Sequence, residues 1–180
     1  TVNQSCIDIL TMKDQTWDHF GTERICAFCS YIPTVIIVAG GSGSRFKNNT
    51  PKQFLKINKK EILSYSVNTF LIHNLIDEII IVVHKDWIKH VKLNYPHCKI
   101  VIGGSSRSKS VHNGLKSISN TTNNILIHDA ARPFISNSII TSCIDMLETS
   151  EAVAPILNMV DSIIQIKNNK PTYLDRDSIK

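Results

Sequence analysis

The sequence predicts an α/β fold in which helices cover both faces of a doubly wound, mostly parallel sheet. Two observations support this prediction. Several short segments, such as 35–38 (VIIV) and 79–83 (IIIVV), are apolar at every position, as strands buried on both faces of a parallel sheet are. These segments alternate with longer ones in which apolar residues recur at helical spacing, which is the pattern of βαβ units.

The expected elements follow one another from residue 33 onward. Strands are expected at 35–38, 79–83, 99–102, 124–128, 153–157, 162–166 and 172–174, and helices at 61–71, 87–93, 108–118 and 138–148. In the first helix, Leu63, Val67 and Phe70 recur every three or four residues and indicate the face that packs on the sheet. A turn is expected at 167–171 (KNNKP), between the last two strands.

Length and composition fit one globular domain. The 180 residues can bury an adequate core. We assign a single Rossmann-like domain to 33–180 and treat 1–32, which has no clean periodicity, as an extension of unknown role. The net charge of +5 is modest and the lysines are scattered, so we expect anionic small molecules rather than nucleic acid as partners. No apolar run approaches the roughly twenty residues of a membrane-spanning helix.

Cysteine usage indicates a reducing compartment. The cysteines are odd in number: Cys6, Cys26, Cys29, Cys98 and Cys143. Cys26 and Cys29 have the spacing of a zinc or redox pair, but no second such pair accompanies them, so coincidence is the favoured interpretation. We therefore expect a cytoplasmic protein.

A glycine-rich loop follows the first strand. Gly40, Gly41 and Gly43 lie within four residues, so the backbone can turn tightly and direct its N–H groups at an anion, above all a phosphate. The spacing is neither that of a P-loop nor that of a G-x-G-x-x-G fingerprint. Arg45 and Lys52 add two cations after the glycines. The loop therefore predicts a phosphate site, although either cation alone would be interpreted as a solvated surface charge.

Polar residues also follow the third and fourth strands, at 103–110 (GGSSRSKS) and 128–133 (HDAARP). Ligands of open α/β sheets bind outside the carboxyl ends of the strands, so these segments and the glycine loop should meet in one crevice. Asp129 is the expected Mg²⁺ ligand, because hard cations bind carboxylate oxygens together with substrate phosphates. A turn or helix-capping role is its alternative. The combination is typical of a nucleotidyltransferase.

Four blocks carry a resemblance to a known family: 39–46 (AGGSGSRF), 51–55 (PKQFL), 103–115 (GGSSRSKSVHNGL) and 128–134 (HDAARPF). In order and spacing they closely resemble the IspD/TarI-like cytidylyltransferases, above all the 2-C-methyl-D-erythritol 4-phosphate cytidylyltransferases of the non-mevalonate isoprenoid pathway. The resemblance covers 33–180. It implies a fold of the nucleotide-diphospho-sugar transferase type and an enzyme that transfers CMP from CTP to the sugar-alcohol phosphate, releasing pyrophosphate.

The resemblance implies a role for each matching residue. Arg45 and Lys52 would stabilise the transition state on the α-phosphate of CTP, and Asp129 would hold Mg²⁺. The nucleotide would be bound by Ala39, Gly40, Gly41, Gly43, Gly104, Ser105 and Ser110. The acceptor phosphate would be bound by Arg132 and, from a second subunit, by Asp161, Ser162 and Arg176. Because a phosphate monoester is largely dianionic at neutral pH, no general base is needed, and catalysis would rest on positioning and charge neutralisation.

The resemblance also implies a protruding β-arm over about 158–176, which clasps a second subunit and makes a homodimer. Family members continue beyond the position at which this chain stops, so we expect the C-terminal part of the family domain to be absent. A plastid-type organelle would suit the pathway as an alternative to the cytoplasm.

Two alternative functions remain open at this stage. The tripeptide 39–41 (AGG) is typical of the ribitol 5-phosphate cytidylyltransferases, which make CDP-ribitol, whereas 128–133 and 174–176 (LDR) suit the methylerythritol branch. The protein could also be an inactive fragment that binds CTP without turnover.

Several residues have a plainer interpretation beside the functional one. His128 is interpreted as a structural residue at a strand end, and Arg107 as a surface charge outside the expected site. Ser110 could be an ordinary early helix residue, and Arg132 could anchor its loop through a carboxylate.

Overall fold

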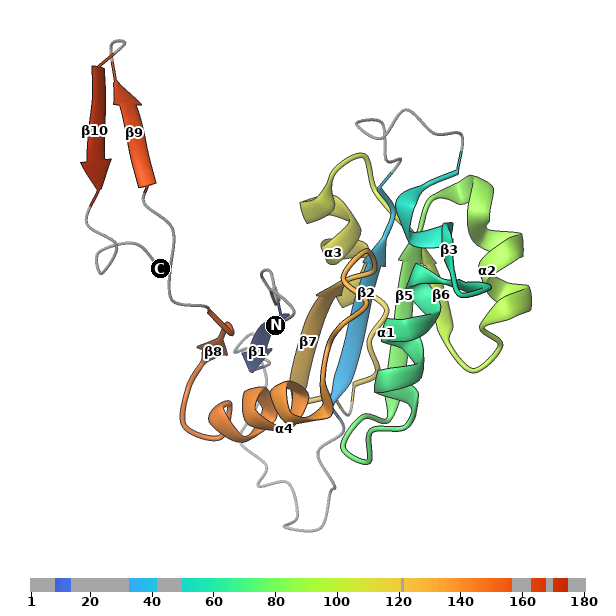
Figure 1. The fold of residues 1–180 in the computed structure, drawn as a ribbon. Helices are drawn as coiled ribbons and strands as arrows, with labels where there is room; N and C mark the ends of the chain where they lie inside the picture. The colour runs from blue at the N-terminus through green and yellow to red at the C-terminus, as the bar shows by residue number, and fades with distance from the viewer. Residues whose placement is uncertain are drawn as a thin grey trace.

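The computed structural model describes residues 9–13, 33–41, 50–120, 122–156, 163–167 and 170–174 (Figure 1). Within these residues, the main sheet has the strand order β6-β5-β2-β7-β1-β8. Its parallel strands are β2 (Thr34–Ala39), β5 (Glu78–Val83), β6 (Lys99–Ile102) and β7 (Asn124–Asp129). The expected α/β fold with a mostly parallel sheet is confirmed.

Helices cover both faces of this sheet, as a doubly wound fold requires. On one face, α1 (Ile62–Leu71), α2 (Ile88–Asn94) and α4 (Asn137–Met146) share a core with the alternate β2 residues Val35 and Ile37. On the other face, α3 (Arg107–Leu115) packs against a smaller core that includes Ile36. Both faces of the strands are therefore buried, which explains their uninterrupted apolar sequences.

One strand comes from the segment to which the sequence analysis gave no role. Strand β1 (Ile9–Lys13) lies between β7 and β8 (Ala152–Val153) and is antiparallel to both. Ile9 pairs with His128 and Lys13 with Asn124. Five residues are too few for a period to be recognised in the sequence. The strand is specified by its two neighbours rather than by its own pattern.

Helix boundaries differ from the expected ones by one to three residues. The expected helix at 87–93 begins with a separate 3₁₀ turn, η3 (Lys85–Trp87), before α2. The expected helix at 108–118 ends at Leu115, after which the backbone forms a tighter turn in which the Ser117 N–H donates to the Gly114 carbonyl at 2.9 Å. No helix in the described ranges has the length and apolar character needed to cross a membrane.

The last part of the chain also departs from expectation. The strand expected at 153–157 is reduced to Ala152–Val153 within the described residues, because Pro155 cannot donate a ladder hydrogen bond. A separate two-stranded sheet pairs β9 (Ile163–Lys167) with β10 (Lys170–Leu174). The turn expected at 167–171 is therefore shorter, since Lys170 pairs with Lys167 and already belongs to a strand.

A short hairpin precedes α1. Its strands β3 (Lys56–Ile57) and β4 (Lys60–Glu61) are joined by Asn58 and Lys59, both of which have positive φ angles, of 50° and 66°. Two such residues form the tight turn that matches the twist of paired strands. The hairpin carries the chain from the 3₁₀ turn η2 (Lys52–Phe54) into α1.

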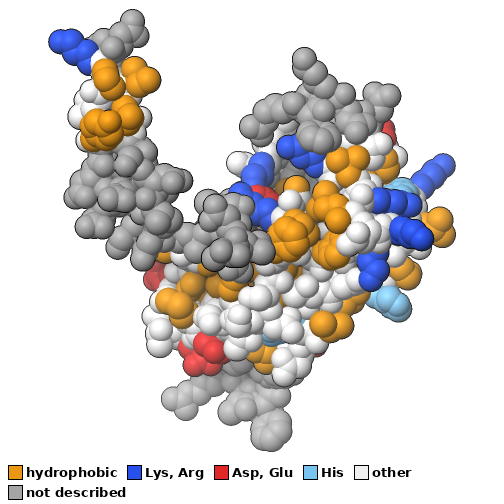
Figure 2. Space-filling view, in the orientation of Figure 1, with side chains coloured by type: hydrophobic (Ala, Val, Ile, Leu, Met, Phe, Trp, Pro, Cys, Tyr) orange, Lys and Arg blue, Asp and Glu red, His pale blue; other side chains and the backbone are white. Residues whose placement is uncertain are grey.

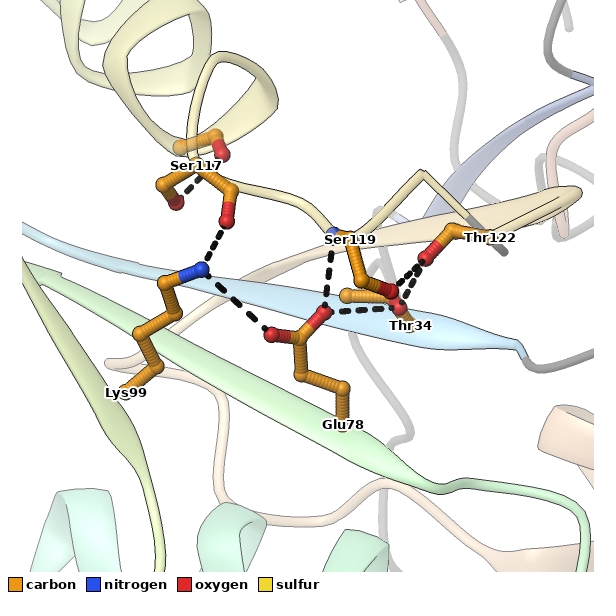
Figure 3. Close-up of polar contacts among 7 residues, drawn as sticks. Thr34, Glu78, Lys99, Ser117, Ser119 and Thr122 are labelled. Carbon is orange, nitrogen blue, oxygen red and sulfur yellow. Dashed lines mark hydrogen bonds and ion pairs between the residues drawn. The ribbon is translucent and has the colours of Figure 1, made fainter.

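A polar cluster joins the amino ends of β2 and β5 (Figure 3). The buried Thr34 hydroxyl lies 2.8 Å from that of Thr122 and donates to Glu78 Oε2 at 3.2 Å. Lys99 Nζ lies 3.7 Å from Glu78 Oε1 and also donates to the Ser117 carbonyl. We call these residues, with Ser119, the amino-end cluster.

Candidate active site

A cavity of about 830 Å³ opens at the carboxyl ends of β2 and β7. The chain passes from β2 to β5 and β6 on one side, and then returns to β7 on the other side of β2. Ligands of open α/β sheets bind at such a point of reversal. In Figure 2, Lys and Arg side chains gather around acidic atoms at this end of the sheet.

Most of the expected site residues meet in this cavity. Its lining includes Ala39, Gly40, Gly41, Lys52, Gly104, Ser105, Ser110, Asp129 and Arg132. The other expected site residues lie outside the described residues: Gly43, Arg45, Asp161, Ser162 and Arg176. The crevice expected from three separate strand ends therefore exists.

Gln53 holds the wall formed by the glycine loop. Its buried side-chain amide donates hydrogen bonds of 2.6 Å to the Ala39 carbonyl and 3.1 Å to the Gly41 carbonyl. The peptide group is planar and trans, so a fixed Ala39 carbonyl directs the Gly40 N–H away from Gln53. The sequence analysis gave Gln53 no role. Its place in the block 51–55 was a signal, but its partners could not be inferred from the sequence.

The turn that carries Lys52 is anchored on its other side by aromatic packing. Phe54, the last residue of η2, stacks on Trp87 with ring centroids 4.3 Å apart, and His90 packs edge-on against both rings. His90 Nε2 lies 2.7 Å from Glu61 Oε1. Lys52 is exposed and lines the cavity. A fixed backbone thus presents a long cationic side chain to the space where an anion would lie.

The amino end of α3 forms the opposite wall. Ser106 caps the helix by accepting the Lys109 N–H at 3.1 Å. The Ser110 hydroxyl accepts the Gly104 N–H at 3.1 Å and donates to the Ser106 carbonyl at 2.9 Å. Ser110 is thus more than an ordinary early helix residue, because it ties the preceding loop to α3. Helix amino ends attract anions.

The backbone approaches so closely here that a side chain would clash at Gly104 and would be crowded at Gly40. A Cβ atom on Gly104 would lie 2.4 Å from Lys109 Cβ, and one on Gly40 would lie 3.2 Å from the Ser110 Oγ. The two glycine-containing segments therefore pack against the start of α3 without any side chain between them. This close packing brings the backbone of both loops to the edge of the cavity.

A buried histidine fixes the loop that follows β7. His128 is fully buried, and its Nε2 lies 3.1 Å from both the Ser66 hydroxyl and the Arg132 carbonyl. Because the carbonyl can only accept, Nε2 carries the proton. Nδ1 has no hydrogen-bond partner among the described residues. Burial lowers the pKa of His128 to about 4, which keeps the ring neutral. These contacts support the interpretation of His128 as a structural residue.

Asp129 is paired with two arginines. Its Oδ1 accepts a hydrogen bond of 3.1 Å from Arg107 Nε and lies 3.0 Å from Arg107 Nη2, and its Oδ2 lies 3.5 Å from Arg132 Nε. The sequence analysis left Arg107 outside the expected site, but in the structure Arg107 lines the cavity. Its position in the block 103–115 was the available signal.

The resemblance implies a Mg²⁺ ion, and the described residues offer it few protein ligands. Among the described residues, no group of three or more His, Cys, Asp or Glu side chains could hold a metal ion. Mg²⁺ is commonly bound through one or two carboxylates together with substrate phosphates. Asp129 therefore fits a Mg²⁺ ion that shares its coordination with phosphate oxygens.

Comparison with protein families gives one match. The model of the family described as IspD, 2-C-methyl-D-erythritol 4-phosphate cytidylyltransferase, matches residues 34–177. The chain belongs to this family. The match begins at the first residue of β2 and includes the cavity and the β9–β10 hairpin.

Individual IspD relatives agree with this assignment. The chain is 42% identical over 149 residues to the 2-C-methyl-D-erythritol 4-phosphate cytidylyltransferase of Clostridium botulinum, covering 79% of this chain and 64% of the relative. It is 36% identical over 148 residues to the bifunctional enzyme IspD/IspF of Pelagibacter ubique, covering 80% of this chain and 39% of that protein. The chain thus spans less than two thirds of either relative.

Solved structures give the same fold. The 4-diphosphocytidyl-2C-methyl-D-erythritol synthase of Anaerococcus prevotii has a TM-score of 0.71 and 27% identity, covering 83% of this chain and 66% of that one. The IspD structure from Francisella tularensis has a TM-score of 0.62 and 28% identity, covering 82% and 68%.

Proposed function

We propose that the protein is a cytidylyltransferase that transfers CMP from CTP to 2-C-methyl-D-erythritol 4-phosphate and releases pyrophosphate. The observation that carries this proposal is the cavity at the carboxyl ends of β2 and β7, where Lys52, Asp129 and Arg132 surround a space next to the amino end of α3. Membership of the IspD family identifies the reaction to test.

The chemistry follows from the charges of the reactants. The acceptor phosphate is largely dianionic at neutral pH and can attack without a general base. Its oxygen bonds to the α-phosphorus of CTP, the bond from that phosphorus to the bridging oxygen breaks, and pyrophosphate leaves. In the proposal, Lys52 and Arg45 stabilise the charge that develops on the α-phosphate.

The remaining residues bind the two substrates. The backbone of Ala39, Gly40, Gly41, Gly43, Gly104 and Ser105, with the Ser110 hydroxyl, would hold the nucleotide. Asp129 would hold a Mg²⁺ ion shared with the triphosphate, and this ion would supply charge neutralisation. Arg132 would bind the acceptor phosphate, and its main chain is already held by His128 and Ser66.

A second subunit would complete the acceptor site. We propose that the β9–β10 hairpin is the arm of a homodimer and that Asp161, Ser162 and Arg176 reach the partner's cavity. The side chains of Ile164, Ile166 and Tyr173 on this hairpin are exposed, with 47%, 71% and 75% of their surface accessible. Burial of these apolar groups against a partner would favour association. Sedimentation should give a dimer, and Ile166→Asp should shift it to monomer.

Ribitol 5-phosphate is the second candidate acceptor, favoured by the sequence Ala39-Gly40-Gly41. Both candidate reactions suit a reducing, cytoplasm-type compartment, in which the odd number of cysteines would stay reduced.

Pyrophosphate release tests the proposal. The full-length protein is incubated with CTP and Mg²⁺, with each acceptor in parallel and with Lys52→Ala as control. Release with methylerythritol 4-phosphate alone supports the proposed function, and release with ribitol 5-phosphate alone moves the protein to the other branch. CTP binding without release from either acceptor would leave a nucleotide-binding protein without turnover.

A further inference from the structure

The cavity carries an imbalance of charge that the proposed roles leave unexplained. Among the described residues that line it, Asp129 is the only acidic one, whereas Lys52, Arg107 and Arg132 are cations. Both oxygens of the Asp129 carboxylate are engaged by guanidinium groups. The carboxylate expected to bind a divalent cation therefore already has cationic partners when no nucleotide is present.

Of the two arginines, Arg107 makes the closer contacts with Asp129. Two of its nitrogens lie against Asp129 Oδ1: Nε donates a hydrogen bond of 3.1 Å, and Nη2 lies 3.0 Å away in an ion pair. The guanidinium therefore occupies the space beside Oδ1 that a metal ion bound to this oxygen would use. A divalent cation at Oδ1 would also lie close to the positive guanidinium and would be repelled by it. Metal binding at Oδ1 thus requires Arg107 to leave.

The two arginines differ in their freedom to move. Arg132 belongs to the loop whose carbonyl is held by His128 and Ser66, and its side chain is 31% exposed. Arg107 is the first residue of α3, and its side chain is 54% exposed. A rotation of the Arg107 side chain disturbs no buried contact. It leaves the guanidinium near the amino end of α3, where phosphates are expected.

We propose that Arg107 is an exchangeable counterion of Asp129. In the nucleotide-free protein it neutralises the carboxylate. When the triphosphate arrives with its divalent cation, the cation takes Asp129 and the guanidinium turns to the phosphates, for which its planar fork is suited. This inference rests on the proposed function, because it assumes that the cavity binds a nucleotide triphosphate. Its consequence is that the metal and the nucleotide each strengthen binding of the other, by the same factor.

Separate binding measurements on metal and nucleotide test this exchange. Free Mn²⁺ is titrated against the full-length protein by electron paramagnetic resonance, and CTP is titrated calorimetrically in the presence of EDTA. A third titration adds Mn²⁺ and CTP together, and it is corrected with a series of Mn²⁺ and CTP without protein. For Arg107→Met we expect several-fold tighter Mn²⁺ binding without nucleotide, several-fold weaker CTP binding without metal, and reduced coupling between the two.

Three variants control the measurement. Lys109→Met makes the same charge change two residues further along α3, at a side chain outside the cavity lining, and should behave like the wild type. Arg107→Lys keeps the charge but loses the fork, and should give intermediate values. Asp129→Asn should abolish the Mn²⁺ signal in both backgrounds, which assigns it to this carboxylate. Thermal unfolding of each variant establishes that it is folded.

The outcomes separate this inference from the proposed function. If Arg107→Met matches Lys109→Met in both titrations, Arg107 is a surface charge and the inference is wrong. It is also wrong if Arg107→Met weakens Mn²⁺ binding without nucleotide, because Arg107 would then orient Asp129 instead of competing for it. Failure of the wild type to bind CTP under any condition would instead overturn the proposed function.

Discussion

The two ends of the parallel sheet satisfy their polar side chains in different ways. In the amino-end cluster, Thr34, Thr122, Glu78 and Lys99 are partners for one another, and acid balances base (Figure 3). At the carboxyl ends, the described residues that line an open cavity include three cations and one carboxylate. The first arrangement is complete without a ligand. The second carries an excess of positive charge among its described residues, which favours an anionic ligand.

This difference predicts which residues affect function and which affect stability. Groups that satisfy one another contribute to folding, and their loss should lower stability with little effect on turnover. Groups held around a cavity contribute to binding, and their loss should lower turnover with little effect on stability. Variants at the two ends, matched in chemistry, can test whether the two contributions are as distinct as the contacts indicate.

The largest separation is expected for two lysines. Lys52→Ala should lower kcat by about 100- to 1,000-fold, or about 3 to 4 kcal/mol, because one charge-stabilising group is removed from the transition state. Lys52 is exposed, so Tm should change little. Lys99→Ala removes the same charge from the amino-end cluster. It should retain activity, and equal kcat values for the two variants would contradict the comparison.

The next largest effect is a pH dependence of stability at the carboxyl end. Burial lowers the pKa of His128 to about 4, whereas the unfolded chain has the ordinary value of about 6.5. Between these values the unfolded state binds more protons than the folded state. The stability that neutral His128 contributes is therefore fully present above about pH 6.5 and is lost as the pH falls through about 4. The loss amounts to roughly 3 kcal/mol.

Urea unfolding between pH 4.5 and 7.5 measures this effect. His128→Gln keeps a side-chain N–H that can reach the Arg132 carbonyl but does not titrate. The other groups titrate alike in both proteins, so the difference between the two unfolding free energies isolates His128. That difference should shrink as the pH falls, and a constant difference would contradict the assignment.

The sequence predicted the parallel sheet and the crevice because both depend on local signals. After their first residues, Thr34 and Glu78, β2 and β5 are uninterrupted apolar runs, and glycine or charged residues follow the strand ends. What was missed depends on partners distant in the sequence. Strand β1 is specified by β7 and β8, and Arg107 joins the site only because the fold places Asp129, 22 positions later, beside it.

Gln53 was missed for the same reason, and it gives a prediction of intermediate size. Gln53→Met keeps the shape of the side chain but leaves the Ala39 and Gly41 carbonyls without their donor. Unsatisfied buried acceptors should lower stability by about 1 to 2 kcal/mol. The loosened glycine loop should also weaken CTP binding. Urea unfolding and a CTP titration measure both quantities, and unchanged CTP affinity would make Gln53 a purely structural residue.

The smallest effect is expected from Glu78→Gln in the amino-end cluster. Glutamine keeps an acceptor for the Thr34 hydroxyl, so only the ionic attraction to Lys99 is lost. With both charged side chains partly exposed, at 23% and 46%, this attraction contributes less than about 1 kcal/mol. The free energy of unfolding should fall by that small amount, whereas kcat and the KM for CTP should equal those of the wild type. A tenfold drop in kcat would mean that strain at the amino ends reaches the cavity through β2 and β5, and the two ends would then act as one unit.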